Sequence, residues 1–125
     1  MMLGGVYSQN DILGLAMQAA SVRDSVHANN IANNDTVGYK KYAVAFEDRL
    51  QAAINDYKRT GTLDLSASVP MVHRIETNLS NRLDGNNVDI NEESAAAYLN
   101  SIKYDMLADS VIANYRQIKM VFDMR

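Results

Sequence analysis

The possible metal-binding side chains of this sequence, fifteen Asp and Glu and two His, show no evident metal-site spacing. The two histidines, His27 and His73, form no evident metal-ligand pattern with the carboxylates. The segment from Asp84 to Asp89 carries oxygen-bearing side chains, as calcium loops do. It fails the EF-hand pattern, which needs Asp or Asn at the fifth place, where Val88 stands, and Gly at the sixth. We therefore interpret the histidines as packed or solvated and the segment as a turn with a helix cap, and we expect no metal.

Side chains that could carry out catalysis are equally sparse. The chain has no cysteine, which excludes disulfides, cysteine-bound metals and thiol nucleophiles. It contains no Ser–His–Asp arrangement, phosphate-binding loop or dinucleotide fingerprint. Asp105 and Asp109 lie one helical turn apart, but nothing near them indicates a perturbed carboxylate. We expect neither an enzyme nor a cofactor.

Composition and charge exclude further classes. The formal net charge is −3, with basic residues scattered among acidic ones, so we expect no nucleic-acid surface. No run approaches the roughly 18 consecutive apolar residues of a membrane span, so we expect no such span. Residues 1–10 contain no Lys or Arg and no long apolar run, so we expect no cleaved signal peptide, and export would need another route.

The composition favours long helices over a compact core. Apolar residues make up 47% of the chain, but there is no Trp and there are two Phe. Such a chain has few bulky side chains to fill a globular interior. We expect one mainly α domain over residues 1–125, in which long N- and C-terminal helices pair around a loosely structured middle.

The first predicted element is an amphipathic helix over about residues 8–34. Its apolar residues follow the alternating spacing of three and four that is typical of a heptad seam: Ile12, Leu15, Ala19, Val22 and Val26. We expect this seam to pack against the C-terminal helix.

The middle, residues 35–87, is predicted to be loosely held and flexible. It opens with a turn at residues 35–38. A short helix is predicted over 43–57, with Phe46 and Leu50 on its apolar side. The alternating segment from Val72 to Leu79 indicates a weak strand, and its polar faces favour an exposed position.

The C-terminal helix is predicted over about residues 89–122. Asp89 fits the N-cap position, and Glu92 three places later resembles a capping box. Two seven-residue rows of apolar side chains run along it: Ala97, Tyr104, Val111 and Ile118 in one, and Leu99, Met106, Ala113 and Met120 in the other. The rows lie about 200° apart around the helix. One N-terminal helix can cover only one of these sides, so the other needs further partners, which we expect to be other subunits.

Two segments resemble the flagellar rod and hook protein family. The first runs from Ala28 to Lys41 and matches the family's N-terminal signature at Ala28, Asn29, Asn30, Ala32, Asn33, Thr36, Gly38, Tyr39 and Lys40. Val37 departs from the signature, because family members commonly have Pro there. The second segment, Gly85, Asn86, Asn87, Val88 and Asp89, is similar to the opening of the C-terminal helix in the short proximal rod members, whose length this chain also shares.

The resemblance implies a structural role in the bacterial flagellum. In the family, the terminal helices pair as an antiparallel coiled coil, and the coils pack into a tube at the core of the axial structure. The implied location is the rod of the basal body, and the implied route is export in an unfolded state through the flagellar type III apparatus. The implied partners are other copies of the chain, other rod proteins, the basal MS-ring or rod-junction proteins and the export gate.

Two groups of residues have a local and a functional interpretation. The asparagines at 29, 30, 33 and 34 are poor helix formers that could simply end a helix, but we favour polar packing between subunits that fixes register. Phe46 and Leu50 could be a local helix contact or an export-gate motif, and both interpretations stay open. The alternative to a rod subunit is a helical adaptor or chaperone that binds one partner through the second apolar side.

Overall fold

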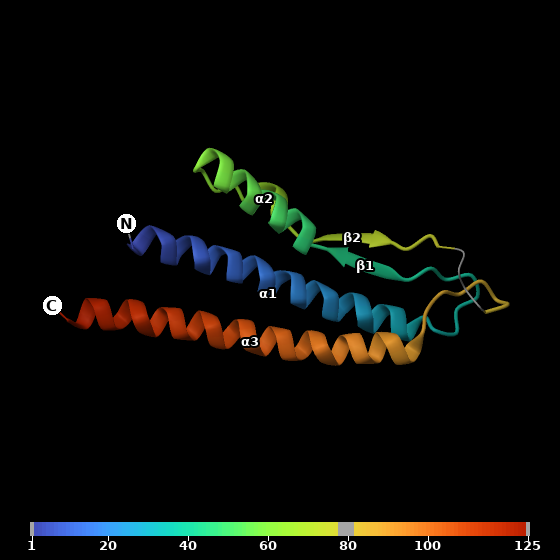
Figure 1. Ribbon diagram of the computed structural model, residues 1–125. Coiled ribbons are helices and arrows are strands. Elements are labelled where there is room, and N and C mark those ends of the chain that lie inside the picture. The colour runs from blue at the N-terminus through green and yellow to red at the C-terminus, as the bar shows by residue number, and fades with distance from the viewer. Residues whose placement is uncertain (1, 78–81, 125) are drawn as a thin grey trace.

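The computed structural model describes residues 2–77 and 82–124. Two long helices, α1 (Met2–Ala32) and α3 (Ile90–Asp123), lie side by side and run antiparallel, so that both chain ends lie at the same end of the molecule (Figure 1). This confirms the expected mainly helical fold with paired terminal helices. Among the described residues, no helix combines the length and the hydropathy needed to cross a bilayer.

The start of α3 follows from its first residues. The side chain of Asp89 accepts hydrogen bonds from the backbone N–H groups of Asn91 and Glu92, at 2.9 and 3.2 Å. These are two of the N–H groups that a helix leaves without an internal partner, so Asp89 caps the helix. The carboxylate of Glu92 lies 3.5 Å from Lys41 Nζ. Glu92 and Glu93 also place negative charge in the first turn, which the helix dipole favours.

The middle of the chain forms a pair of short antiparallel strands, which we call the hairpin, and a third helix between them in sequence. Strand β1 (Tyr42–Ala45) pairs antiparallel with β2 (Met71–Arg74), with Tyr42 opposite Arg74 and Ala45 opposite Met71. Helix α2 (Glu47–Thr60) follows β1, and a single 3-10 turn, η1 (Ser66–Ser68), precedes β2. All four residues of β2 are exposed.

The hairpin corrects the predicted start of the short helix. We expected a helix from Ala43, but Tyr42–Ala45 is extended and α2 begins at Glu47. Pairing with β2 and with side chains of α1 accounts for the difference, since both satisfy the backbone of β1 from outside. The strand expected from Val72 to Leu79 is observed only as far as Arg74, and its last two residues lie outside the described part of the chain.

The buried interior is small and largely polar. Among the described residues, the buried apolar side chains are Ala19, Ala20, Phe46 and Val88, and the buried polar ones are Asn30, Ser68, Asn86, Glu93 and Asn100. Buried polar groups need hydrogen-bond partners to be tolerated. Much of the specific structure of this fold therefore lies in its polar contacts. Many of them lie at the end of the α1–α3 pair that is opposite the chain termini, which we call the closed end (Figure 1).

Candidate functional site

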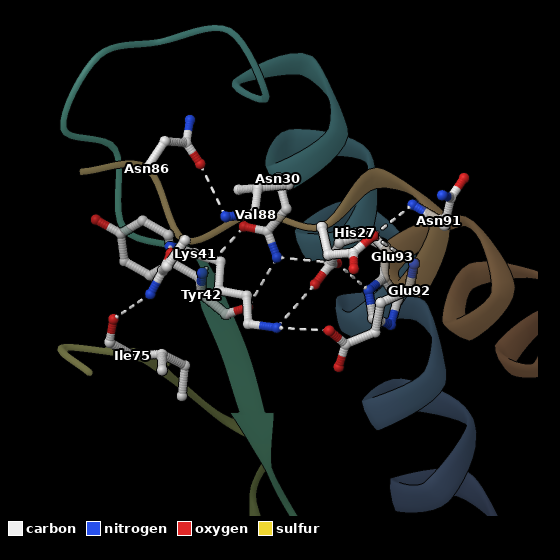
Figure 2. Close-up of polar contacts among 12 residues, drawn as sticks. His27, Asn30, Lys41, Tyr42, Ile75, Asn86, Val88, Asn91, Glu92 and Glu93 are labelled. Carbon is white, nitrogen blue, oxygen red and sulfur yellow. Dashed lines mark hydrogen bonds and ion pairs between the residues drawn. The ribbon is translucent and has the colours of Figure 1, made fainter. Parts of the chain in front are cut away.

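Asn30 joins three elements at the last turn of α1. Its side-chain oxygen accepts from the backbone N–H of Tyr42 at 3.0 Å and from the Tyr39 hydroxyl at 3.1 Å. Its side-chain nitrogen donates to the Tyr42 carbonyl at 2.9 Å and to the Glu93 carboxylate at 3.1 Å. The residue is 0% exposed, and these four bonds use the whole hydrogen-bonding capacity of a primary amide. Asn30 thus ties α1 to β1 and α3 (Figure 2).

Glu93 is a buried carboxylate enclosed by donors. One oxygen lies 2.7 Å from His27 Nδ1 and accepts from Asn30, and the other lies 3.7 Å from Lys41 Nζ (Figure 2). A buried charge is tolerated only when it is paired and hydrogen-bonded, and removing one partner of such a set is strongly destabilising. The set therefore holds the last turns of α1 against the first turn of α3.

Tyr39 completes the contacts around Asn30. Its hydroxyl also accepts from the side-chain nitrogen of Asn29 at 3.2 Å. Burial, helped by the nearby Tyr42 and Glu93, raises the pKa of the Tyr39 phenol above its ordinary value. A tyrosine phenol is already protonated at neutral pH, and the raised pKa extends this state to higher pH, so the Tyr39 hydroxyl remains a donor to Asn30.

Asn86 closes the exit of the chain from α1. Its side-chain nitrogen lies 2.9, 3.0 and 2.9 Å from the carbonyl oxygens of Asn33, Asn34 and Thr36. Its oxygen accepts from the backbone N–H of Val88 at 2.8 Å. The side chain is fully buried. A residue from the segment that leads into α3 thus satisfies backbone groups that follow the end of α1.

Two glycines allow these segments to come together. Gly38 and Gly85 have φ angles of 71° and 77°, a region that residues with a side chain rarely adopt. The Gly38 N–H donates to the Asp84 carbonyl at 2.9 Å, and a Cβ built on Gly85 would lie 3.8 Å from the Gly38 Cα. Lys40 Nζ donates to the Gly85 carbonyl at 2.6 Å. The two family-like segments therefore bind each other within one chain.

Asn87 extends the same contact to the hairpin. Its side-chain oxygen accepts from the Lys41 N–H at 2.7 Å, and its nitrogen donates to the Ile75 carbonyl at 2.9 Å. We call the whole set the closed-end network, which consists of His27, Asn30, Tyr39, Lys41, Tyr42, Asn86, Asn87 and Glu93.

A second polar contact fixes the start of α2 on α1. Arg23 forms an ion pair with Glu47 and donates to the Val44 carbonyl at 3.2 Å. The hydrogen bond from Arg23 lowers the pKa of Glu47 below its ordinary value. Phe46, between these two contacts, is buried. Leu50 is half-buried, and its N–H bonds to the Phe46 carbonyl at 2.9 Å.

The two predicted rows of α3 differ in exposure. Leu99, Met106 and Met120 are 60%, 64% and 58% exposed, and Ala113 is also exposed. We call these four residues the outer row. In the other row, Ala97, Val111 and Ile118 are half-buried, and Tyr104 is 41% exposed.

Comparison with known proteins identifies the family. Residues 11–40 match the model of the flagella basal body rod protein family. The flagellar basal body rod protein FlgB of Bacillus subtilis (strain 168) is 31% identical over 113 residues, which cover 85% of this chain and 86% of that protein. This chain belongs to the FlgB family of flagellar basal-body rod proteins. The FlgB proteins of Borrelia hermsii and Borreliella burgdorferi are 30% and 29% identical, over 89% and 84% of this chain and 93% and 88% of theirs.

The FlgB-family signature has an inner and an outer side in this structure. Asn30, Asn33, Tyr39 and Lys40 are at least partly buried, whereas Ala28, Asn29, Ala32, Thr36 and Gly38 are exposed. We expected the asparagines to set register between subunits. Asn30 is fully engaged within its own chain, and Asn33 bonds to the Asn29 carbonyl at 2.8 Å. Asn30 thus bonds to β1 and α3 of its own chain, a role that neither interpretation included, and packing between subunits stays a prediction.

The hydrogen bonds between α1 and α3 come from residues outside the apolar seam that we predicted on α1. On α1, the residues that take part in those hydrogen bonds are Asn10, Ala20 through its carbonyl, His27 and Asn30. Ala19 is fully buried, while Ile12, Leu15 and Val22 are half-buried.

Several site residues were missed because their partners are distant in sequence. His27 was interpreted as packed or solvated, and neither Glu93 nor Lys41 was assigned to a site. The contact between His27 and Glu93 joins residues that are 66 positions apart, and no local sequence pattern predicts it. One available signal was the pair of polar residues Glu93 and Asn100, which lie seven positions apart and therefore on one side of the predicted helix.

Proposed function

We propose that this FlgB-family chain is a structural subunit of the bacterial flagellar basal-body rod, in its proximal part, and that it assembles through its terminal helices. The observation that carries the proposal is the outer row of α3. A single helix exposes four aligned residues, three of them large and apolar, about 100° around the helix from the line of Asn100, which contacts α1. Exposed apolar patches of this kind mark association surfaces.

The energetics support assembly over a free monomer. The same helix also exposes Tyr98, Ile112, Tyr115 and Phe122. Burial of apolar surface contributes about 25 cal/mol per Å², so covering the exposed apolar side chains of α3 with neighbouring subunits would give a large favourable free energy. The small apolar interior of the chain gives comparatively little.

The partners we propose are other copies of this chain and other rod proteins, with the MS-ring or rod-junction proteins at the base of the rod. We further propose that the chain reaches the rod through the flagellar type III export apparatus, without a cleaved signal peptide. Support for these partners comes from the relatives, whose names place them in the basal-body rod. We propose no catalytic role.

A charge in the outer row tests the proposal. Met106→Asp should leave the isolated chain helical, because the side chain is exposed, but should prevent rod formation and motility, because a buried carboxylate is costly in an assembled interface. Ser101→Asp places the same charge at another exposed position of α3 and serves as the matched control. Motility equal to wild type in Met106→Asp would contradict assembly through this row. A defined small complex with one non-flagellar protein would favour the adaptor alternative.

A further inference from the structure

Polar side chains occur at regular places along the contact between α1 and α3. Glu93 bonds with His27 and Asn30 at the closed end. Further along, Asn100 Nδ2 donates to the Ala20 carbonyl at 2.7 Å. Near the chain ends, Asn114 Nδ2 donates to the side-chain oxygen of Asn10 at 3.0 Å. We call Glu93, Asn100 and Asn114 the polar row.

The polar row lies on one line of the helix. Its members are separated by seven and fourteen residues, which returns to nearly the same side of an α-helix. Leu99 of the outer row directly precedes Asn100, and adjacent residues point about 100° apart. The two apolar sides of α3 are therefore not equivalent. The side turned to α1 carries polar groups with partners on α1, and the outer row carries none.

Asn100 is poorly explained by stability alone. It is 5% exposed, and its side-chain oxygen has no hydrogen-bond partner among the residues that the structure describes. Its one bonded partner across the contact among the described residues is the carbonyl of Ala20, a residue that is almost fully buried. An apolar side chain at such a position generally stabilises a helix pair more than an incompletely bonded amide does. Buried polar residues at helix contacts are better known for specifying which pairing forms.

We propose that the polar row selects the side of α3 that pairs with α1 of the same chain, and so keeps the outer row free. If α3 turned its outer row toward α1, Asn10, His27 and Asn30 would lose the bonds that they make with the polar row. That loss penalises the wrong face. The inference rests on the proposed function only in assigning the free face to neighbouring subunits.

The test uses the isolated full-length chain, which has no cysteine and can be spin-labelled at chosen sites. Labels are placed at Ser21 on α1 and Ile112 on α3, both exposed. Ser21 lines a hollow with Asp105, and Ile112 lies seven residues beyond Asp105 on the same line of α3. Turning the outer row toward α1 rotates α3 by about 100°, which moves a side chain at a radius of about 5 Å by roughly 8 Å. Pulsed electron paramagnetic resonance resolves that change.

The wild-type chain should give a single distance. The double variant Asn100→Leu/Asn114→Leu should keep its helicity and resist urea at least as well, but should add a second, longer distance. Leu107→Met changes an apolar residue between the two asparagines and should keep the single distance. A double variant that unfolds, or that keeps only the wild-type distance, would overturn the proposal. Because no rod is assembled in this test, its failure would leave the proposed function intact, and a motile Met106→Asp strain would leave this proposal intact.

Discussion

The side-chain nitrogen of Asn30 lies 3.1 Å from the carboxylate of Glu93, so the end of α1 and the beginning of α3 share a buried polar contact. The contact spans 63 residues of sequence. Because the same amide also binds both backbone groups of Tyr42, one side chain determines how the two terminal helices and the hairpin meet.

Replacing this amide should destabilise the fold. Asn30→Ala removes four hydrogen bonds, including both bonds to the Tyr42 backbone and one of the donors to the buried Glu93, which we expect to lower the free energy of unfolding by about 3 kcal/mol. Asn29→Ala, an exposed neighbour in the same motif, should change it by less than about 1 kcal/mol. Urea unfolding followed by circular dichroism measures both. Equal effects of the two substitutions would show that the closed-end network is not what holds the helices.

The ion pair between Arg23 and Glu47 predicts a dependence of stability on acid. Since Arg23 lowers the pKa of Glu47 in the folded chain, the stabilisation is present above the ordinary glutamate pKa and is lost as pH falls through the lowered one. Glu47 is largely exposed, so the effect should be small and weakened by salt. The urea midpoint should therefore fall less on acidification in Glu47→Gln than in the wild type. If the urea midpoints of Glu47→Gln and of the wild type fell in parallel with pH at low salt, the prediction would be contradicted.

The middle of the chain should be the least protected part of the isolated monomer. No residue of α2 is buried, and β2 is exposed throughout. Segments with few buried contacts open at low free energy. Hydrogen exchange at low protein concentration should show weak protection over residues 60–77, in contrast to the central turns of α1 and α3. Strong, uniform protection of this stretch would mean that it is already fixed before assembly.

Phe46 and Leu50 allow the export hypothesis to be separated from packing. Phe46 is buried in the folded chain, so it could be read by an export gate only while the chain is unfolded. If the gate binds the pair, replacing both with Ala should reduce secretion and cause the protein to accumulate in the cell. Secretion should be measured in a strain that cannot build beyond the export apparatus. Normal secretion with impaired rod formation would assign both residues to packing.

The terminal helices could be predicted because their signals are local. Asp89 caps α3 from one residue away, and no Gly or Pro interrupts the apolar rows that follow. The exposure of the outer row also follows from the pattern, since one helix cannot cover two opposite sides.

The closed-end network could not be predicted, because it depends on long-range pairs. Tyr42–Ala45 is extended through contacts with β2 and Asn30, not through its own sequence. Asn86 was recognised as part of a turn, but its carbonyl partners lie about 50 residues earlier in the chain. Local propensity carries no information about such partners.

The central claim is that the outer row of α3 contacts neighbouring subunits in the rod. A photo-reactive amino acid at Met106, incorporated in motile cells and activated in isolated basal bodies, tests it directly. The same group at Ser101, an exposed position on another line of α3, serves as the control. The account predicts efficient cross-links from Met106 to another rod subunit, and few from Ser101. Assembled rods in which Met106 forms no link to another subunit would contradict it.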